Sequence, residues 1–170
     1  MTHHPNQRRV LTAAVLTTLF PLMGAEAVSP ASSIGTAAPA AAPPPVVMEL
    51  LSRGTVAKPF EAEAKGIELE AHRAMDVVTL RLTFAPGTTI DWHTHPGPVV
   101  ATVTSGSLTF TNDKCARHTF KVGEAFVERP GERGKARNTG TTTTTTIVSF
   151  FVPKGTDKLL VPAAPPPCAR

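Results

Sequence analysis

Hydrophobic and polar residues alternate along much of the second half of the chain. In residues 78–84 a hydrophobic side chain occupies every second position, with threonine and arginine between them. This period of two is typical of a strand that is buried on one face. The same alternation recurs in residues 99–104 and 108–110. Residues 141–152 are rich in the β-branched and aromatic residues that favour strands.

Turn signals separate these segments at short intervals. They are Ala85-Pro86-Gly87, Ser105-Gly106, Gly123 and Pro130-Gly131. No apolar stripe with a helical period occurs after residue 45. Short strands with a turn every eight to twelve residues, as a rough rule, predict an all-β sandwich or barrel. Within that fold, we expect the threonine run 141–146 to form a solvated strand face that precedes a buried segment.

The N-terminus has the pattern of an export signal. A basic pair, Arg8 and Arg9, precedes a mostly apolar stretch, and Ala25-Glu26-Ala27 has the small-x-small form of a cleavage site. We therefore predict a signal peptide over residues 1–27, with Sec export or, because the arginines are adjacent, twin-arginine export. The alternative is a retained N-terminal anchor. The apolar stretch is shorter than the roughly 20 residues needed to span a bilayer, so the mature chain is expected to lack a transmembrane segment.

Residues 28–45 are built almost wholly from alanine, proline, serine, glycine and threonine, which predicts a disordered linker. Residues 46–170 are then sufficient for one compact domain. The formal net charge of the chain is +4, without a clustered lysine and arginine stripe, which argues against nucleic acid as a partner. The chain has two cysteines, Cys115 and Cys168, and export predicts that they form a disulfide, with two free thiols as the alternative.

The strongest candidate for chemistry is the pair His93 and His95. Alternate side chains of a strand point to the same face, so the two imidazoles should project into one volume. Two converging imidazoles are half of a divalent-metal site. Asp91 has the same parity and is a candidate third ligand. Trp92, between them, should face the opposite side and pack there.

Two glycine-containing patterns resemble a known family. They are Gly87-x5-His93-x-His95 followed by Gly106, and Gly123-x7-Gly131-x6-Asn138. Both resemble the motifs of the cupin superfamily, in the correct order, and the residues around them resemble a subgroup of small exported bacterial cupins of unassigned function. The resemblance implies a double-stranded β-helix, or jelly-roll barrel, with its core over residues 76–152 and a ligand pocket inside.

The resemblance also implies a metal-ligand set that this chain has only in part. In the family both histidines and a glutamate of the first motif, with a histidine of the second, usually hold the metal. His93 and His95 match, but Val99 stands at the glutamate position and Gly134 at the position of the last histidine. Glu128, in the second motif, is a candidate replacement, although a glutamate at a strand end is commonly a surface charge.

These observations lead to competing functional hypotheses. The first is a small-molecule pocket lined by Val99, Ala101 and Gly134, in which divalent metal is weakly held or absent. The alternative is a metal-dependent enzyme, of oxygenase or isomerase type, that uses His93, His95 and a substitute carboxylate to hold Fe, Mn, Ni or Zn. A third is a structural domain of the cell envelope. The resemblance also suggests a homodimer, and the small-molecule ligand remains unidentified.

A last group of residues is cationic. Arg129, Arg133, Lys135 and Arg137 lie close together in the second motif. They form either a solvated basic rim or a surface that attracts an anionic ligand.

Overall fold

The computed structural model describes residues 45–169, so the predicted signal peptide and nearly all of the predicted linker lie outside the described residues. The described residues form twelve strands and one short 3₁₀ helix, η1 (Pro167–Ala169). The strands are β1 (Val47–Val56), β2 (Phe60–Ala64), β3 (Ile67–Ala71), β4 (Met75–Phe84), β5 (Thr89–Thr94), β6 (Val99–Ser105), β7 (Ser107–Thr111), β8 (Arg117–Lys121), β9 (Ala125–Glu128), β10 (Gly134–Arg137), β11 (Thr144–Pro153) and β12 (Val161–Pro162).

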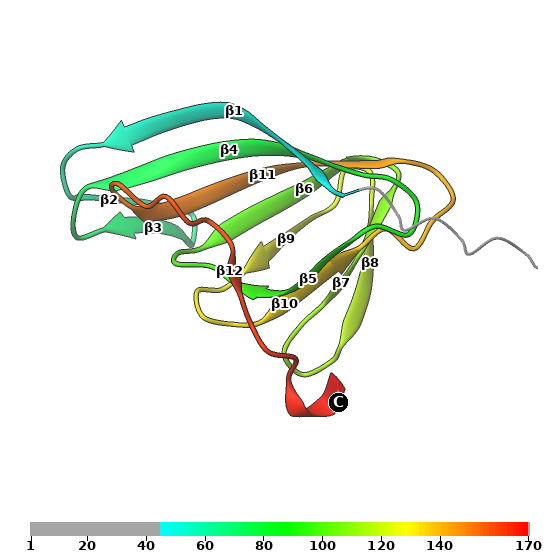
Figure 1. Ribbon diagram of the computed structural model, residues 1–170. Helices are drawn as coiled ribbons and strands as arrows, with labels where there is room; N and C mark the ends of the chain where they lie inside the picture. Colours follow the sequence, from blue (N-terminus) through cyan, green and yellow to red (C-terminus); the bar gives the residue numbers. More distant parts are fainter. Residues whose placement is uncertain (1–44, 170) are drawn as a thin grey trace, which may run out of the picture. The chain divides into compact units, whose positions relative to one another are not determined.

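Ten of the strands form two antiparallel sheets that face each other (Figure 1). The strand order is β1-β4-β11-β6-β9 in one sheet and β12-β5-β10-β7-β8 in the other. From β4 onward the chain passes back and forth between the sheets, the connectivity of a jelly roll. Strands β2 and β3 form a separate hairpin. The predicted all-β, double-stranded β-helix fold is therefore confirmed.

The alternating sequence pattern places the core between the two sheets. In β4 every second side chain is buried, and β11 repeats the pattern beside it. The buried hydrophobic cluster consists of Val78, Leu80, Leu82, Phe84, Val99, Ala101, Val103, Leu108, Phe126, Ala136, Val148, Phe150 and Val152. No helix among residues 45–169 has the length and apolar character needed to cross a bilayer.

The threonine run differs from the expectation. Strand β11 begins only at Thr144, and the side chains of Thr144 and Thr146 point inward and are buried, while Thr145 points outward. The prediction of a uniformly solvated face was therefore wrong for Thr144 and Thr146. The reason is the strand period, which sends every second side chain of β11 into the core whatever its polarity.

Two residues of the motifs shape tight corners. Gly106, between β6 and β7, has a φ of +69°, and a Cβ there would lie 2.6 Å from Thr144 Oγ1 and 2.8 Å from the Thr143 carbonyl oxygen. Only glycine combines this conformation with the close approach. Asn138, which is fully buried, donates to the carbonyls of Phe84 (3.0 Å) and Thr142 (2.8 Å) and accepts from Gly140 N.

Candidate metal centre

A bulge in β5 directs the histidines inward. Along the β5–β10 pairing, Gly134 lies opposite His93 and Ala136 opposite Ile90, so three steps of β5 match two steps of β10. The extra residue interrupts the alternation, and both Ile90 and His93 line the cavity between the sheets. His93 and His95 are each 5% exposed.

The same bulge turns Asp91 away from the histidines. Its side chain is 76% exposed and accepts a hydrogen bond from Lys135, with Nζ and Oδ1 2.9 Å apart. Hydrogen bonding from Lys135 and from the Trp92 backbone lowers the pKa of this carboxyl. The prediction that Asp91 shares the inner face was wrong, because strict alternation assumes a strand without a bulge.

The third donor of the inner site is Glu128, at the end of β9. Strand β9 pairs with β6 so that Glu128 lies directly opposite Val99. Its side chain is only 11% exposed, and Oε2 lies 3.3 Å from His95 Nε2 and 3.6 Å from His93 Nε2. The three donor atoms lie within 4.8 Å of one another. Glu128 is therefore a buried member of the histidine cluster and not a surface charge.

Gly134 explains why this carboxylate fits. A Cβ at position 134 would lie 2.8 Å from Glu128 Oε2 and 2.7 Å from two ring carbons of Phe110. The glycine thus leaves the space that the carboxylate and the ring occupy. Ala101 lines the inner cavity, whereas Val99 lies in the hydrophobic cluster and Gly134 borders Glu128.

Backbone carbonyls fix the tautomers of both imidazoles. His93 Nδ1 lies 2.7 Å from the carbonyl oxygen of Asp91, and His95 Nδ1 lies 2.7 Å from that of Leu159. Because a carbonyl oxygen only accepts, each Nδ1 must carry a proton, and in the neutral ring Nε2 then presents its lone pair. Both Nε2 atoms face Glu128. Histidine ligands of metals are typically held in this way by a second hydrogen bond.

The charges of the three groups affect one another. Burial alone would lower the pKa of His93, but the Glu128 carboxylate and the Asp91 carbonyl outweigh it, and the pKa is raised. Burial alone would raise the pKa of Glu128, but the two imidazoles hold it below its ordinary value. The carboxylate is therefore ionised and places a negative charge beside the two imidazole nitrogens. This charge favours a cation.

The donor set fits a divalent ion. Ligands around a tetrahedral ion with bonds of about 2.0–2.1 Å lie about 3.3–3.4 Å apart, close to the two nitrogen–oxygen distances of 3.3 and 3.6 Å, whereas the three donor atoms together span up to 4.8 Å and would close in slightly around an ion. His95 Nε2 is buried and has no hydrogen bond of acceptable geometry, although Glu128 Oε2 lies 3.3 Å away. Because buried polar atoms are almost always satisfied, an ion shared with Glu128 is one way to satisfy this nitrogen.

The cavity beside the donors is small and otherwise apolar. Its volume of about 20 Å³ is enough for roughly one water-sized group. The hydrophobic side chains that line it include Leu82, Phe84, Phe126, Val148, Phe150 and Leu160. Thr146 also lines it, and its hydroxyl oxygen is buried without a partner. A polar ligand in this cavity would therefore be largely desolvated.

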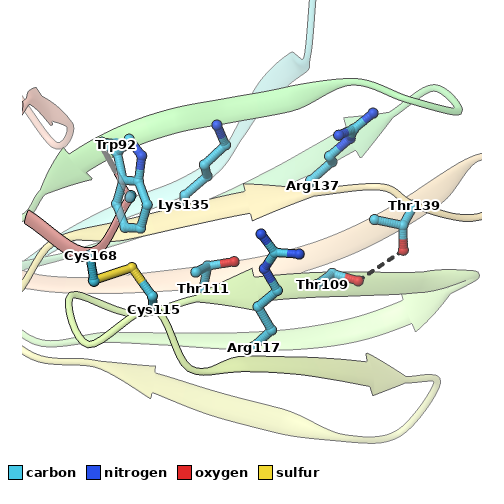
Figure 2. A pocket seen from close by; sticks show the side chains of 10 residues that line it. Trp92, Thr109, Thr111, Cys115, Arg117, Lys135, Arg137, Thr139 and Cys168 are labelled. Carbon is cyan, nitrogen blue, oxygen red and sulfur yellow. Dashed lines mark hydrogen bonds between the residues drawn. A yellow bond between two sulfur atoms is a disulfide. The ribbon is translucent and has the colours of Figure 1, made fainter. Parts of the chain in front are cut away.

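Trp92 lies on the other face of β5, as expected. It is 8% exposed and lines a separate pocket on the outer face of the β12-β5-β10-β7-β8 sheet (Figure 2). Lys135 and Arg137 line the same outer pocket. Arg129, another cation of the second motif, lies on the surface, with its guanidinium 3.7 Å from Glu132 Oε2.

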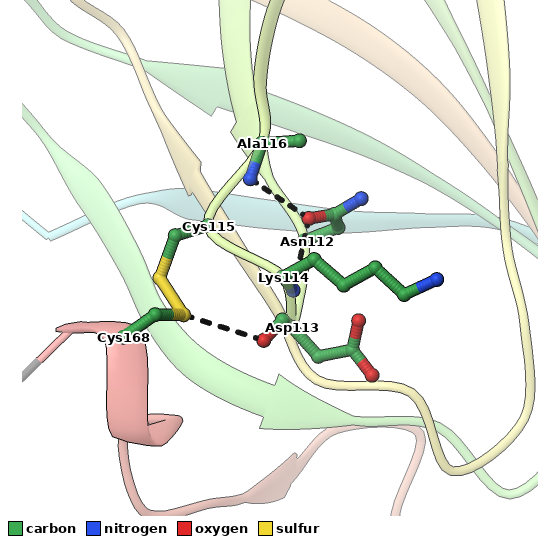
Figure 3. Close-up of a disulfide and its surroundings, with 6 residues drawn as sticks. All are labelled: Asn112, Asp113, Lys114, Cys115, Ala116 and Cys168. Atoms are coloured by element: carbon green, nitrogen blue, oxygen red, sulfur yellow. Dashed lines mark hydrogen bonds between the residues drawn. A yellow bond between two sulfur atoms is a disulfide. The ribbon is translucent and has the colours of Figure 1, made fainter.

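The C-terminal tail closes the metal centre from outside. Strand β12 pairs with β5 beside His93, Leu159 holds His95, and Leu160 lines the inner cavity. The Cys115–Cys168 disulfide, which confirms the predicted pairing, ties this tail to the loop between β7 and β8 (Figure 3). Sequence analysis missed the role of Leu159, because a backbone carbonyl leaves no signal in the residue type.

Comparison with known proteins gives a family match. Residues 80–152 match the family described as "Cupin domain". No curated protein matches the chain.

Several solved structures are similar to this chain. An uncharacterized conserved protein with a double-stranded beta-helix domain from Klebsiella pneumoniae is 19% identical, with a TM-score of 0.45 over 62% of this chain and 80% of that chain. The DMSP lyase DddQ from Ruegeria pomeroyi is 15% identical, with a TM-score of 0.46 over 52% of this chain and 44% of that one. An oxalate oxidase in complex with the substrate analogue glycolate is 29% identical, with a TM-score of 0.40 over 44% of this chain and 41% of that one. The chain thus spans less than half the length of either enzyme.

Proposed function

The described domain belongs to the cupin superfamily, and from this premise we propose that the protein is an exported metal-dependent cupin whose ion is held by His93, His95 and Glu128. Glu128 would replace the glutamate that the family usually has at the position of Val99, one strand away. It would also use the space that Gly134 leaves at the position of the second-motif histidine. The set is then two imidazoles and one carboxylate.

One observation carries this proposal. Among the described residues, the two buried side-chain polar atoms without a hydrogen-bond partner are His95 Nε2 and Thr146 Oγ1, and both residues line the same cavity. In an otherwise apolar cavity, two such atoms indicate a polar occupant that satisfies both. An ion at the donors, with a small ligand near Thr146, satisfies this requirement better than a metal-free pocket does.

The volume of the cavity limits what can occupy it. Pockets for organic ligands are typically about 300–1,000 Å³, whereas this cavity has about 20 Å³. This volume counts against a preformed pocket for an organic ligand with or without a metal, so the preference for the metal-dependent alternative depends on the donor set of His93, His95 and Glu128. A two-histidine, one-carboxylate set suits non-haem Fe(II), which favours an oxygenase over an isomerase.

The side chains have distinct roles in this proposal. The ion would act as a Lewis acid on a small ligand. Asp91 and Leu159 orient the imidazoles through their carbonyl oxygens, Glu128 supplies the negative charge, and the hydrophobic wall excludes water so that these charges act at full strength.

The test is metal binding by the mature protein. We expect reconstitution with Fe(II), and with Zn(II) or Co(II) as spectroscopic and calorimetric substitutes, to give one ion per chain. Glu128→Gln removes the charge at nearly constant volume and should weaken binding by at least about tenfold, a change of about 1.4 kcal/mol. Glu132→Gln, an exposed glutamate four residues later, is the matched control and should bind as the wild type does. Wild-type protein without metal after reconstitution, or equal affinities of all three proteins, would refute the proposal.

The oxygenase class has its own test. Nitric oxide, a surrogate for dioxygen, should bind to the Fe(II)-loaded protein and give the paramagnetic resonance signal of an iron nitrosyl. Loading with Fe(II) without any nitrosyl signal would retain the metal site and exclude the oxygenase.

Export is part of the same proposal. The disulfide is consistent with an extracytoplasmic location, because such bonds are rare in the cytoplasm. The N-terminal sequence of protein recovered from the periplasm or medium should begin after Ala27.

A further inference from the structure

We propose that the outer face of the β12-β5-β10-β7-β8 sheet carries a second binding site, for a small molecule that bears a phosphate or sulfate group. The site is the pocket of about 300 Å³ in Figure 2, hereafter the outer pocket. It is lined by Trp92, Thr109, Thr111, Cys115, Arg117, Lys135, Arg137, Thr139, Cys168 and Ala169.

The outer pocket and the metal centre use opposite faces of the same strands. In β10, Gly134 borders Glu128 and Ala136 lines the inner cavity, whereas Lys135 and Arg137 line the outer pocket. In β5, His93 faces inward and Trp92 outward. The sheet therefore separates the two sites, so the anion site in the outer pocket does not depend on the proposed metal centre.

The charges of the outer pocket are unbalanced. Three cations line it, and no carboxylate is among its lining residues. Lys135 has an ion pair with Asp91, but within residues 45–169 neither Arg117 nor Arg137 has a hydrogen-bond or ion-pair partner on its guanidinium. Like charges close together on a sheet face are destabilising. A bound anion would remove this repulsion.

The register places the three cations on strands that flank Thr109 and Thr111. Thr111 lies between Arg117 on β8 and Lys135 on β10, and Thr109 lies beside Arg137. Neighbouring strands are about 4.8 Å apart, so Arg117 and Lys135 start about 10 Å apart; the Arg117 side chain can reach the space above Thr111, while the Lys135 ammonium lies 2.9 Å from Asp91 on β5. Figure 2 shows Arg117 extending over Thr111 and Thr109 toward this space.

The donors match the geometry of an oxyanion. A guanidinium can donate two parallel hydrogen bonds to one phosphate or sulfate, and lysine adds a point charge. The hydroxyl of Thr109 lies 2.9 Å from those of both Thr119 and Thr139, so these hydroxyls form a chain that can turn a donor outward. The two arginines without an ion-pair partner favour a dianion over a single carboxylate.

One end of the outer pocket is apolar. Trp92 and the Cys115–Cys168 disulfide form this end (Figure 2). The volume is at the lower limit of about 300 Å³ for ligand pockets and exceeds the need of an inorganic ion alone. We therefore assign the charged part to the oxyanion and the end at Trp92 to a small organic group, preferably aromatic.

The composition of the chain provides a direct assay. Trp92 is the only tryptophan and the chain has no tyrosine, so intrinsic fluorescence reports on the outer pocket. Titration of metal-free protein at physiological salt with inorganic phosphate, sulfate and phenyl phosphate should give saturable changes in fluorescence. Phenyl phosphate should bind several-fold more tightly than phosphate. Isothermal titration calorimetry should give the same order.

Matched variants separate the site from general charge. Arg117→Gln/Arg137→Gln should weaken binding by at least about tenfold, as expected for the loss of charged hydrogen bonds. Lys58→Gln/Arg73→Gln makes the same change in net charge at exposed positions elsewhere and should bind within about twofold of the wild type. His93→Ala/His95→Ala should also retain binding.

Each contrary result would overturn a defined part of the proposal. Titrations that never saturate, or equal weakening in the two charge variants, would mean that no specific oxyanion site exists. Loss of binding in the histidine variant would place the anion in the inner cavity. Equal affinities for phosphate and phenyl phosphate would refute the assignment of an organic group to Trp92.

Discussion

The substitution Gly134→Ala tests the packing on which the metal centre depends. The backbone at Gly134 does not have a positive φ, so alanine is conformationally acceptable there, and the effect of the change is steric. The new Cβ would lie 2.7 Å from Phe110 ring carbons and 2.8 Å from Glu128 Oε2. Real Cβ atoms do not approach other atoms this closely, so the ring and the carboxylate must move.

The expected loss of stability follows from two opposing terms. Overpacking a core position costs about 1–3 kcal/mol. Replacing glycine by alanine recovers about 0.4–1 kcal/mol through the unfolded chain. We expect a net loss of roughly 1–2 kcal/mol, or a melting temperature lower by roughly 3–10 °C for a domain of this size. Displacement of the carboxylate should also weaken metal binding by about tenfold or more.

Gly54→Ala is the matched control. Gly54 lies in β1, and a Cβ there would have no neighbour within 4 Å, so this variant should be unchanged or slightly more stable. Urea denaturation of the metal-free proteins measures stability, and calorimetric titration with Zn(II) measures affinity. Adding Phe110→Leu to Gly134→Ala should recover stability without recovering affinity. If Gly134→Ala matches Gly54→Ala in both measurements, the glycine does not make room for Glu128, and the packing argument fails.

Three further predictions concern stability, each measured by urea denaturation. The Cys115→Ser/Cys168→Ser variant should be less stable by roughly 4 kcal/mol, because the disulfide joins residues 53 positions apart; an unchanged midpoint would contradict this. Asn138→Ala should cost about 2–4 kcal/mol by leaving buried backbone groups unpaired, and a loss below about 0.5 kcal/mol would mean that water replaces the side chain. Hydrogen bonds from Thr55, Arg53 and the Gly155 amide lower the pKa of Asp76 to about 2 from its ordinary 3.8. The stability that this carboxylate contributes should be complete above about pH 4 and decline as the pH falls toward 2, and Asp76→Asn should lose that part of the pH dependence.

The alternating pattern predicted the all-β class and most of the strands after residue 77, whereas the jelly roll was predicted from the resemblance of the two motifs, and β1, β2, β3 and β12 were not predicted. In residues 78–84 and 99–104 the period of two is a local property, because each peptide unit turns the next side chain to the opposite face. The hydrophobic effect then selects the face that is buried. The two cysteines left a single pairing, and the motif glycines predicted the corners. The strands and corners depend on residues that are near one another in sequence, and the disulfide pairing depends on the presence of only two cysteines.

The composition of the site depended on which strands become neighbours. Glu128 joins His93 and His95 only because β9 pairs with β6 and Gly134 leaves space, and neither fact follows from the sequence around Glu128. Asp91 was assigned to the wrong face because the bulge is fixed by pairing with β10 and not by β5 alone.

The contacts of the C-terminal tail and the lining of the outer pocket also depend on which strands become neighbours. Leu159 contributes a carbonyl oxygen, which every residue has, and Arg117 meets Lys135 across β7 only in the folded sheet. The sequence by itself determined the all-β class, the shared face of His93 and His95 and the disulfide pairing, because these follow from local periodicity and composition. Tertiary structure decided the third ligand and the second pocket, because side chains distant in sequence meet only when the sheets close.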